Sequence, residues 1–178
     1  MFSFLPQVQK RYSEFFSFFA RFFHERLRLL PNQVSWLAFF LSLVSAIFIF
    51  QKNLVIAFVF LFLSLIFDAI DGTIARKYNL ETKLGWWLEI IFDRFAELLL
   101  FLALYSAGYI TFNLVAIAYV AIIIMTVLFL KTKIDFGGKR IVLLFGPWVG
   151  FILVFYIITF IQTLSILGSL YKIFRKYV

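Results

Sequence analysis

Long apolar runs, separated by short polar intervals, dominate the sequence from residue 31 onward. Four of them cover about 33–50, 54–76, 84–106 and 114–130. A helix needs about 20 apolar residues to cross a bilayer core, so each run predicts a membrane span. The last run, 141–171, is too long for one typical span and short for two.

The positions of the basic residues decide between five and six spans. When both termini, the 77–84 loop and the 131–140 loop share one side, that side holds 15 of the 17 basic residues. The positive-inside rule makes this side cytoplasmic, and two cytoplasmic termini require an even number of spans. We therefore predict an all-α integral membrane protein with six transmembrane helices. The last two must be short or tilted, with a break near Gly146-Pro147 or Gly150.

Residues 1–30 have a different pattern, in which apolar side chains recur at helical spacing and charged side chains fill the opposite face. This pattern predicts an amphipathic helix lying in the membrane interface, ahead of one membrane domain over residues 31–178. The helix serves either as an anchor or as a lid over the site. Its apolar positions are Val8, Tyr12, Phe15, Phe16, Phe19, Phe22, Phe23, Leu27 and Leu30.

Composition agrees with a membrane protein. The chain is 64% hydrophobic, its mean hydropathy is +1.01, and it contains no cysteine, which excludes disulfide and thiol chemistry. The formal net charge is +8, and the basic residues that produce it flank the apolar runs. It therefore indicates topology and contact with membrane lipids, not nucleic-acid binding.

Four acidic residues stand out because carboxylates inside or beside an apolar span are costly. Asp68 and Asp71 share one face near the end of the second run, and Glu89 and Asp93 share one face near the start of the third. The polar connection 77–84 predicts a hairpin that brings these faces opposite each other. Oxygen ligands without histidine or cysteine favour Mg²⁺, Mn²⁺ or Ca²⁺.

The acidic stretch resembles the CDP-alcohol phosphatidyltransferase family. The family signature is D-x2-D-G-x2-A-R-x8-G-x3-D-x3-D, and the chain departs from it at one position, where Glu89 replaces the third aspartate. The spacer of eight residues is intact. The matching residues are Asp68, Asp71, Gly72, Ala75, Arg76, Gly85 and Asp93.

The resemblance implies an enzyme of phospholipid biosynthesis that transfers a phosphatidyl group from a CDP-linked lipid to an alcohol and releases CMP. It implies that Asp68, Asp71, Glu89 and Asp93 bind two divalent metal ions, either Mg²⁺ or Mn²⁺. It also implies that Asp93 is the general base for the acceptor hydroxyl. The active site would then lie on the cytoplasmic side of the inner membrane, and the chain could form homodimers.

Four further matched residues are expected to bind the CDP-linked lipid. Gly72, Ala75 and Gly85 are small enough for a nucleotide to approach the helices closely. Arg76 can bind a phosphate in a bidentate manner, or can serve only as a positive-inside anchor.

The alcohol acceptor is expected to contact the most basic loop, residues 131–140. Its cations bind a phosphorylated polyol such as inositol phosphate or glycerol 3-phosphate, or they only set topology. The string G-K-R-I-V-L-L resembles a segment of the inositol-phosphate branch of the family, as does L-E-x3-D-R-x2-E. The candidate cations are Lys131, Lys133, Lys139 and Arg140.

Two other functions remain open from the sequence. Glu89 raises the alternative of a catalytically impaired relative, and the carboxylates within the membrane raise that of a cation transporter. A transport path needs polar groups across the bilayer, whereas these acids gather at one end of two runs. Arg94 is expected to pair with a nearby carboxylate inside the bundle.

Overall fold

The structure, a computed structural model, describes residues 16–132 and 138–175, which contain helices, turns and no strand. Residues 16–26 are helical and end in the π-helical turn η1 (Phe22–Arg26). The remaining helices are α2 (Pro31–Phe50), α3 (Leu54–Lys77), α4 (Lys83–Ser106), α5 (Phe112–Thr132), α6 (Lys139–Leu144), α7 (Gly146–Val149) and α8 (Phe151–Arg175).

Within the described ranges, four helices have the length and hydropathy of membrane spans, namely α2, α3, α5 and α8. They confirm an all-helical protein with apolar helices of membrane-spanning length. α4 is also 24 residues long, but acidic and basic side chains interrupt its first half. The first four predicted runs correspond to α2 through α5 within a few residues at each end.

The structure does not confirm the predicted pair of spans within 141–171. α6 and α7 have six and four residues, and a single helix of 25 residues, α8, follows them. The break does lie at the predicted glycines. Gly150 has a φ of +89°, which favours glycine, and a Cβ added to Gly146 would lie 2.2 Å from the Phe151 ring. The expectation of six spans is therefore not confirmed.

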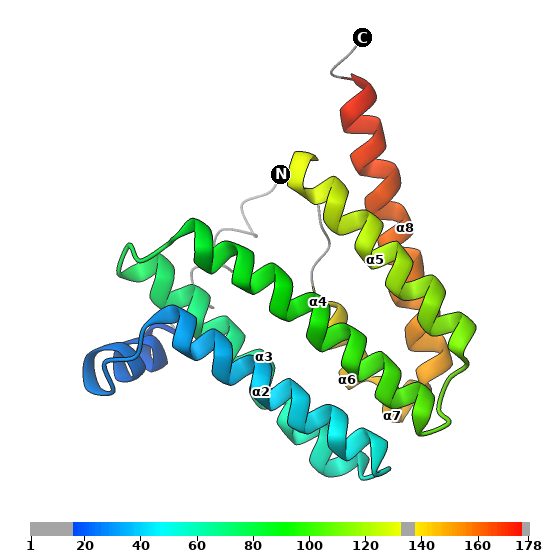
Figure 1. Cartoon of the computed structure of the whole chain (residues 1–178), viewed down its shortest axis with the longest axis horizontal. Helices are drawn as coiled ribbons and strands as arrows, with labels where there is room; N and C mark the ends of the chain where they lie inside the picture. The colour runs from blue at the N-terminus through cyan, green and yellow to red at the C-terminus, as the bar shows by residue number, and fades with distance from the viewer. Residues whose placement is uncertain (1–15, 133–137, 176–178) are drawn as a thin grey trace, which may run out of the picture.

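α2 lies against both α3 and α4, so that these three helices form one group (Figure 1). Small polar side chains allow a close approach between α2 and α3. The hydroxyls of Ser42 and Ser64 are 2.6 Å apart, and Ser45 donates a hydrogen bond of 2.8 Å to the carbonyl oxygen of Ala57. Such small residues are typical of helix contacts in membranes.

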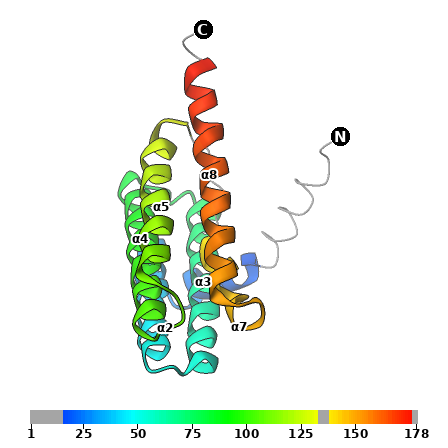
Figure 2. The same cartoon turned by 90° about the vertical axis from the view of Figure 1, so that its right-hand side faces the viewer.

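α5 and α8 form a second pair, which joins the first group near the α4–α5 turn and diverges from it toward the other end (Figure 1). α6 lies between α3 and α8, and in Figure 2 the C-terminal part of α8 extends beyond the other helices. The main hydrophobic core lies at the end where the two groups meet, around Leu61, Leu100, Phe101 and Phe155. The charged ends of α3 and α4 are thus left outside this core.

The helical segment 16–26 packs on the charged end of α3. Ala20 is fully buried in a small cluster with Val34, Ile70 and Ile74. The Tyr78 hydroxyl donates a 2.7 Å hydrogen bond to Glu25. Partial burial and this hydrogen bond raise the pKa of Tyr78 above its ordinary value. Residues 1–15 lie outside the described ranges, so the amphipathic interfacial helix over 1–30 stays a prediction.

Candidate active site at the ends of α3 and α4

The four predicted carboxylates lie on neighbouring turns at the same end of α3 and α4. Asp71 is close enough to Asp68 and Glu89 for mutual repulsion, and Glu89 in turn is close to Asp93. α4 begins directly after a short turn, where the Thr82 side chain accepts a 3.0 Å hydrogen bond from the Gly85 backbone N–H. The predicted hairpin therefore brings the acidic faces together.

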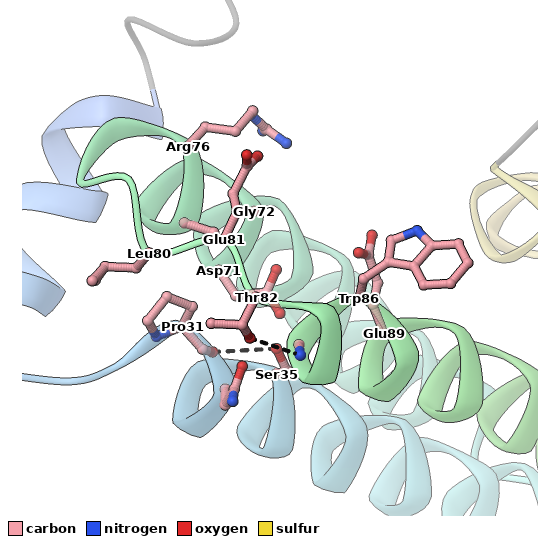
Figure 3. A pocket seen from close by; sticks show the side chains of 13 residues that line it. Pro31, Ser35, Asp71, Gly72, Arg76, Leu80, Glu81, Thr82, Trp86 and Glu89 are labelled. Atoms are coloured by element: carbon pink, nitrogen blue, oxygen red, sulfur yellow. Dashed lines mark hydrogen bonds between the residues drawn. The ribbon is translucent and has the colours of Figure 1, made fainter. Parts of the chain in front are cut away.

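A first pocket of about 310 Å³ opens between α2, α3, α4 and the turn that joins the last two (Figure 3). It brings together two of the carboxylates and all four residues that the signature associates with the CDP-linked lipid. Its lining consists of Pro31, Asn32, Ser35, Asp71, Gly72, Ala75, Arg76, Leu80, Glu81, Thr82, Gly85, Trp86 and Glu89.

The two glycines of the first pocket occupy tight positions. A Cβ on Gly85 would lie 3.0 Å from the side-chain oxygen of Asn32 and 3.1 Å from that of Thr82. A Cβ on Gly72 would lie 3.2 Å from a guanidinium nitrogen of Arg76. Glycine at these two positions therefore leaves space beside three polar side chains, which suits a polar ligand.

A second pocket of about 320 Å³ adjoins the other carboxylates, Asp68 and Asp93. It contains two of the four basic residues predicted to bind the acceptor. The lining residues are Leu65, Asp68, Ala69, Asp93, Arg94, Glu97, Gly138, Lys139, Arg140 and Ile141.

Arg140 is the central cation of the second pocket. Its Nη2 donates to Asp68 Oδ2 at 3.2 Å and also pairs with Asp93 Oδ1. The Arg140 side chain is 7% exposed, so these ion pairs lie in a poorly solvated environment where each charge needs a partner. Within the same pocket, Arg94 pairs with Glu97 at 2.8 Å, which confirms the expectation that Arg94 pairs with a nearby carboxylate.

The carboxylate oxygens of the site are chemically suited to bind a divalent cation. Asp71 is 7% exposed, and no described residue places a cation within salt-bridge distance of Asp71 or of Glu89. A buried carboxylate such as Asp71 requires a counter-charge, and the oxygens of Asp71 and of the exposed Glu89 suit Mg²⁺ or Mn²⁺. Among the described residues, however, no three such side chains form one compact group, and Arg140 lies between Asp68 and Asp93.

The structure does not gather the whole set of predicted basic residues. Lys131 is exposed near the end of α5 and lines neither pocket. Lys133 lies outside the described residues. Lys139 and Arg140, by contrast, are buried at the start of α6 and line the second pocket.

Sequence reasoning missed several lining residues. Asn32 and Ser35 lie one turn apart at the start of α2, and both line the first pocket with Asp71. The P-N-Q-V-S string at the start of the first span carried this signal, since an i,i+3 pair of polar residues there must share a face. Nothing comparable marked Trp86 as a lining residue.

The fold and its pockets define the general class, a helical membrane protein with a carboxylate-lined polar site at one end of the bundle. Within that class, the chain belongs to the CDP-alcohol phosphatidyltransferase family, whose model matches residues 28–174.

Curated relatives match over shorter stretches. The chain is 38% identical over 66 residues to the CDP-diacylglycerol–inositol 3-phosphatidyltransferase of Saccharomyces cerevisiae, covering 36% of this chain and 29% of that protein. It is 28% identical over 71 residues to the archaetidylinositol phosphate synthase of Pyrococcus horikoshii, covering 40% and 38%. The matches thus span less than half the length of these relatives.

Solved structures resemble the whole fold. A crystal structure of the Mycobacterium tuberculosis phosphatidylinositol phosphate synthase with CDP-DAG bound has a TM-score of 0.70 and 18% identity, covering 88% of this chain and 92% of that one. The same synthase in complex with manganese and citrate also has a TM-score of 0.70 at 18% identity, covering 88% and 87%. At this identity the likeness establishes the fold.

Proposed function

We propose that the protein transfers a phosphatidyl group, or its ether-lipid counterpart, from a CDP-linked lipid to an alcohol and releases CMP. One observation carries the proposal: the first pocket, lined by the residues matched to the CDP-linked lipid, lies beside a second pocket that holds both carboxylates and cations. The mycobacterial synthase of the same fold, solved with CDP-DAG, supports a donor of this class.

In this proposal the donor's CMP moiety occupies the first pocket. Gly72, Ala75 and Gly85 allow the nucleotide to approach α3 and α4. The exposed Arg76 guanidinium at the pocket rim pairs with a phosphate oxygen. The apolar surface of the helices leaves the acyl chains in the membrane, so that only the polar head must enter the pocket.

Asp68, Asp71, Glu89 and Asp93 would hold the divalent metal, Mg²⁺ or Mn²⁺, as two ions. Bound there, the metal supplies neutralisation of the negative charge on the donor's diphosphate. The manganese complex of the mycobacterial synthase supports a metal requirement in this fold.

The acceptor is proposed to bind in the second pocket. Its hydroxyl oxygen bonds to the phosphorus that carries the lipid, the bond from that phosphorus to CMP breaks, and Asp93 takes the hydroxyl proton. Lys139 and Arg140 are the buried cations there, which favours an acceptor that carries phosphate, such as inositol phosphate or glycerol 3-phosphate. The names of the yeast and Pyrococcus relatives support an inositol-type acceptor.

We also propose that the bundle crosses the inner membrane six times, with both termini and the site on the cytoplasmic side. α4 supplies the third crossing, and α6 with α7 supplies a broken fifth crossing. Leu144 and Pro147 lie beside residues 54–63, so this segment follows α3 from the carboxylates toward its other end. The clustering of basic residues on one side supports the orientation.

The direct test is CMP release by the purified full-length chain with CDP-diacylglycerol and Mn²⁺ or Mg²⁺. The acceptor panel contains inositol 1-phosphate, free inositol, glycerol 3-phosphate and serine. We expect release with a phosphorylated polyol and not with serine. If neither CDP-diacylglycerol nor an ether-linked CDP-lipid supports release with any acceptor, the proposal is wrong.

Glu89 separates an active enzyme from an impaired relative. As a metal ligand, Glu89 should tolerate replacement by aspartate, so Glu89→Asp is expected to keep or raise kcat. Glu89→Ala is expected to raise the Mn²⁺ concentration for half-maximal CMP release by about tenfold or more, because an oxygen ligand is lost. Unchanged metal dependence in Glu89→Ala would remove Glu89 from the metal site. Glu25→Gln, an exposed acid outside both pocket linings, is the control.

A further inference from the structure

Glu97 is a buried carboxylate that lines the second pocket and lies one turn beyond the signature on α4. The residue is 3% exposed. Its Oε2 accepts a hydrogen bond from Arg94 Nη1 at 2.8 Å, and its Oε1 lies 3.9 Å from Lys139 Nζ. A buried carboxylate is tolerated when cations compensate it, and here each oxygen faces its own cation. Glu97 therefore connects α4 to the start of α6.

α6 needs such a connection because it is short. It has six residues, which is below the length at which a helix is stable by itself, so its orientation depends on contacts with other elements. On the buried side of α6, Leu143 is 1% exposed and joins the main core. At its first turn, the only charged side chains that α6 offers are Lys139 and Arg140.

Lys139 and Arg140 point to different partners. Successive helical residues project about 100° apart, so the direction of one fixes that of the other. Lys139 faces Glu97 on the inner side of the pocket, and Arg140 faces Asp68 and Asp93. The rotation of α6 that places Arg140 beside Asp93 is thus the same rotation that places Lys139 beside Glu97.

We infer that Glu97 is a positioning residue for the phosphorylated acceptor: by holding Lys139, it sets the rotation of α6 that directs Arg140 into the second pocket. This inference rests on the proposed function and adds to it a determinant outside the matched signature. Arg94 is the alternative route for an effect of Glu97, since it binds the other carboxylate oxygen from the same helix.

The first experiment is steady-state CMP release by Glu97→Gln, which keeps the shape of the side chain and removes its charge. We expect the acceptor KM to rise about tenfold, with kcat within about twofold of the wild type and the donor KM unchanged. Glu97→Asp restores the charge, so its acceptor KM should lie between those of the wild type and Glu97→Gln. A purely structural role would lower kcat or the amount of folded enzyme and would not separate the two KM values.

A double-mutant cycle with Lys139→Met identifies the route. If Glu97 acts through Lys139, Glu97→Gln adds less than about twofold to the acceptor KM in the Lys139→Met background. If the full effect of Glu97→Gln persists in that background, the route through Lys139 is wrong. Glu25→Gln controls for loss of an acidic charge, and thermal unfolding in detergent controls for folding.

Calorimetric binding of inositol 1-phosphate and glycerol 3-phosphate to detergent-solubilised enzyme gives a readout independent of turnover. We expect about tenfold weaker binding in Glu97→Gln than in the wild type for the phosphate that binds. Equal binding by the wild type and Glu97→Gln would overturn the inference. If the wild type nevertheless releases CMP, the proposed function remains supported. If the wild type binds neither phosphate, the inference is wrong whatever its turnover.

Discussion

Asp93→Asn is expected to abolish CMP release while the protein still folds. Asp93 lies in the second pocket beside Arg140, where we propose that it takes the proton from the acceptor hydroxyl and also binds metal. Loss of a general base typically costs about 10²–10⁴ in rate, and loss of a metal ligand adds to it. We expect kcat to fall by at least about 100-fold in the CMP-release assay.

Two controls accompany Asp93→Asn. Asparagine keeps the size of the side chain, and Asp68 still pairs with Arg140, so the thermal unfolding midpoint in detergent should change little. Raising the Mn²⁺ concentration distinguishes the two roles of Asp93. Excess metal would restore much of the rate if Asp93 were a ligand alone, and would not do so if it is also the base. Full activity of Asp93→Asn would contradict both assignments.

Replacing Lys139 and Arg140 together by alanine is expected to raise the acceptor KM by about 100-fold. The two residues are the buried cations of the second pocket, and charge-assisted hydrogen bonds to phosphate are among the strong ones in proteins. The donor KM should change much less, because the first pocket contains neither residue. The measurement is CMP release at varied inositol 1-phosphate and at varied CDP-diacylglycerol.

The matched control for this pair is Lys52→Ala. Lys52 is exposed in the α2–α3 turn, at the opposite end of α3 from the carboxylates, and lines neither pocket. Lys131→Ala tests the remaining described cation of the basic loop, and its exposed position outside both pockets predicts a smaller effect than the double variant. An unchanged acceptor KM in the double variant would show that Lys139 and Arg140 do not bind the acceptor and serve only membrane topology.

Local periodicity was enough to predict the carboxylate faces. Residues three or four apart share a helix face whatever the rest of the chain does, so the approach of Asp68 and Asp71 to Glu89 followed from spacing and a short hairpin. The same argument predicted α2 through α5, because each apolar run has about the length that a membrane span needs.

The break near Gly146 and Gly150 was predicted, but the short lengths of α6 and α7 could not be predicted in this way. Residues 141–171 read as one apolar run, and hydropathy does not reveal that Gly146 packs against Phe151 or that Gly150 turns the chain. The pairing of Arg140 with Asp68 and Asp93 joins positions 72 and 47 residues apart. Such a contact depends on tertiary packing, which the periodicity of a single sequence does not encode.

The distribution of charge also argues against a cation transporter. The four carboxylates and the second pocket lie at one end of α3 and α4, and the main core at the other end is built from side chains such as Leu61, Leu104 and Phe155. A transport path would need polar groups along its length. The geometry supports chemistry at one membrane surface instead.

The central claim is that the four carboxylates form a metal-dependent site for phosphatidyl transfer. Its most direct test is a Mn²⁺ titration of CMP release by the wild type, after EDTA treatment, with CDP-diacylglycerol and inositol 1-phosphate or glycerol 3-phosphate. We expect no release in EDTA, full recovery on adding Mn²⁺, and a shift of the titration to higher Mn²⁺ in Asp71→Asn. Release that continues in EDTA, or that titrates identically in Asp71→Asn, would contradict the claim.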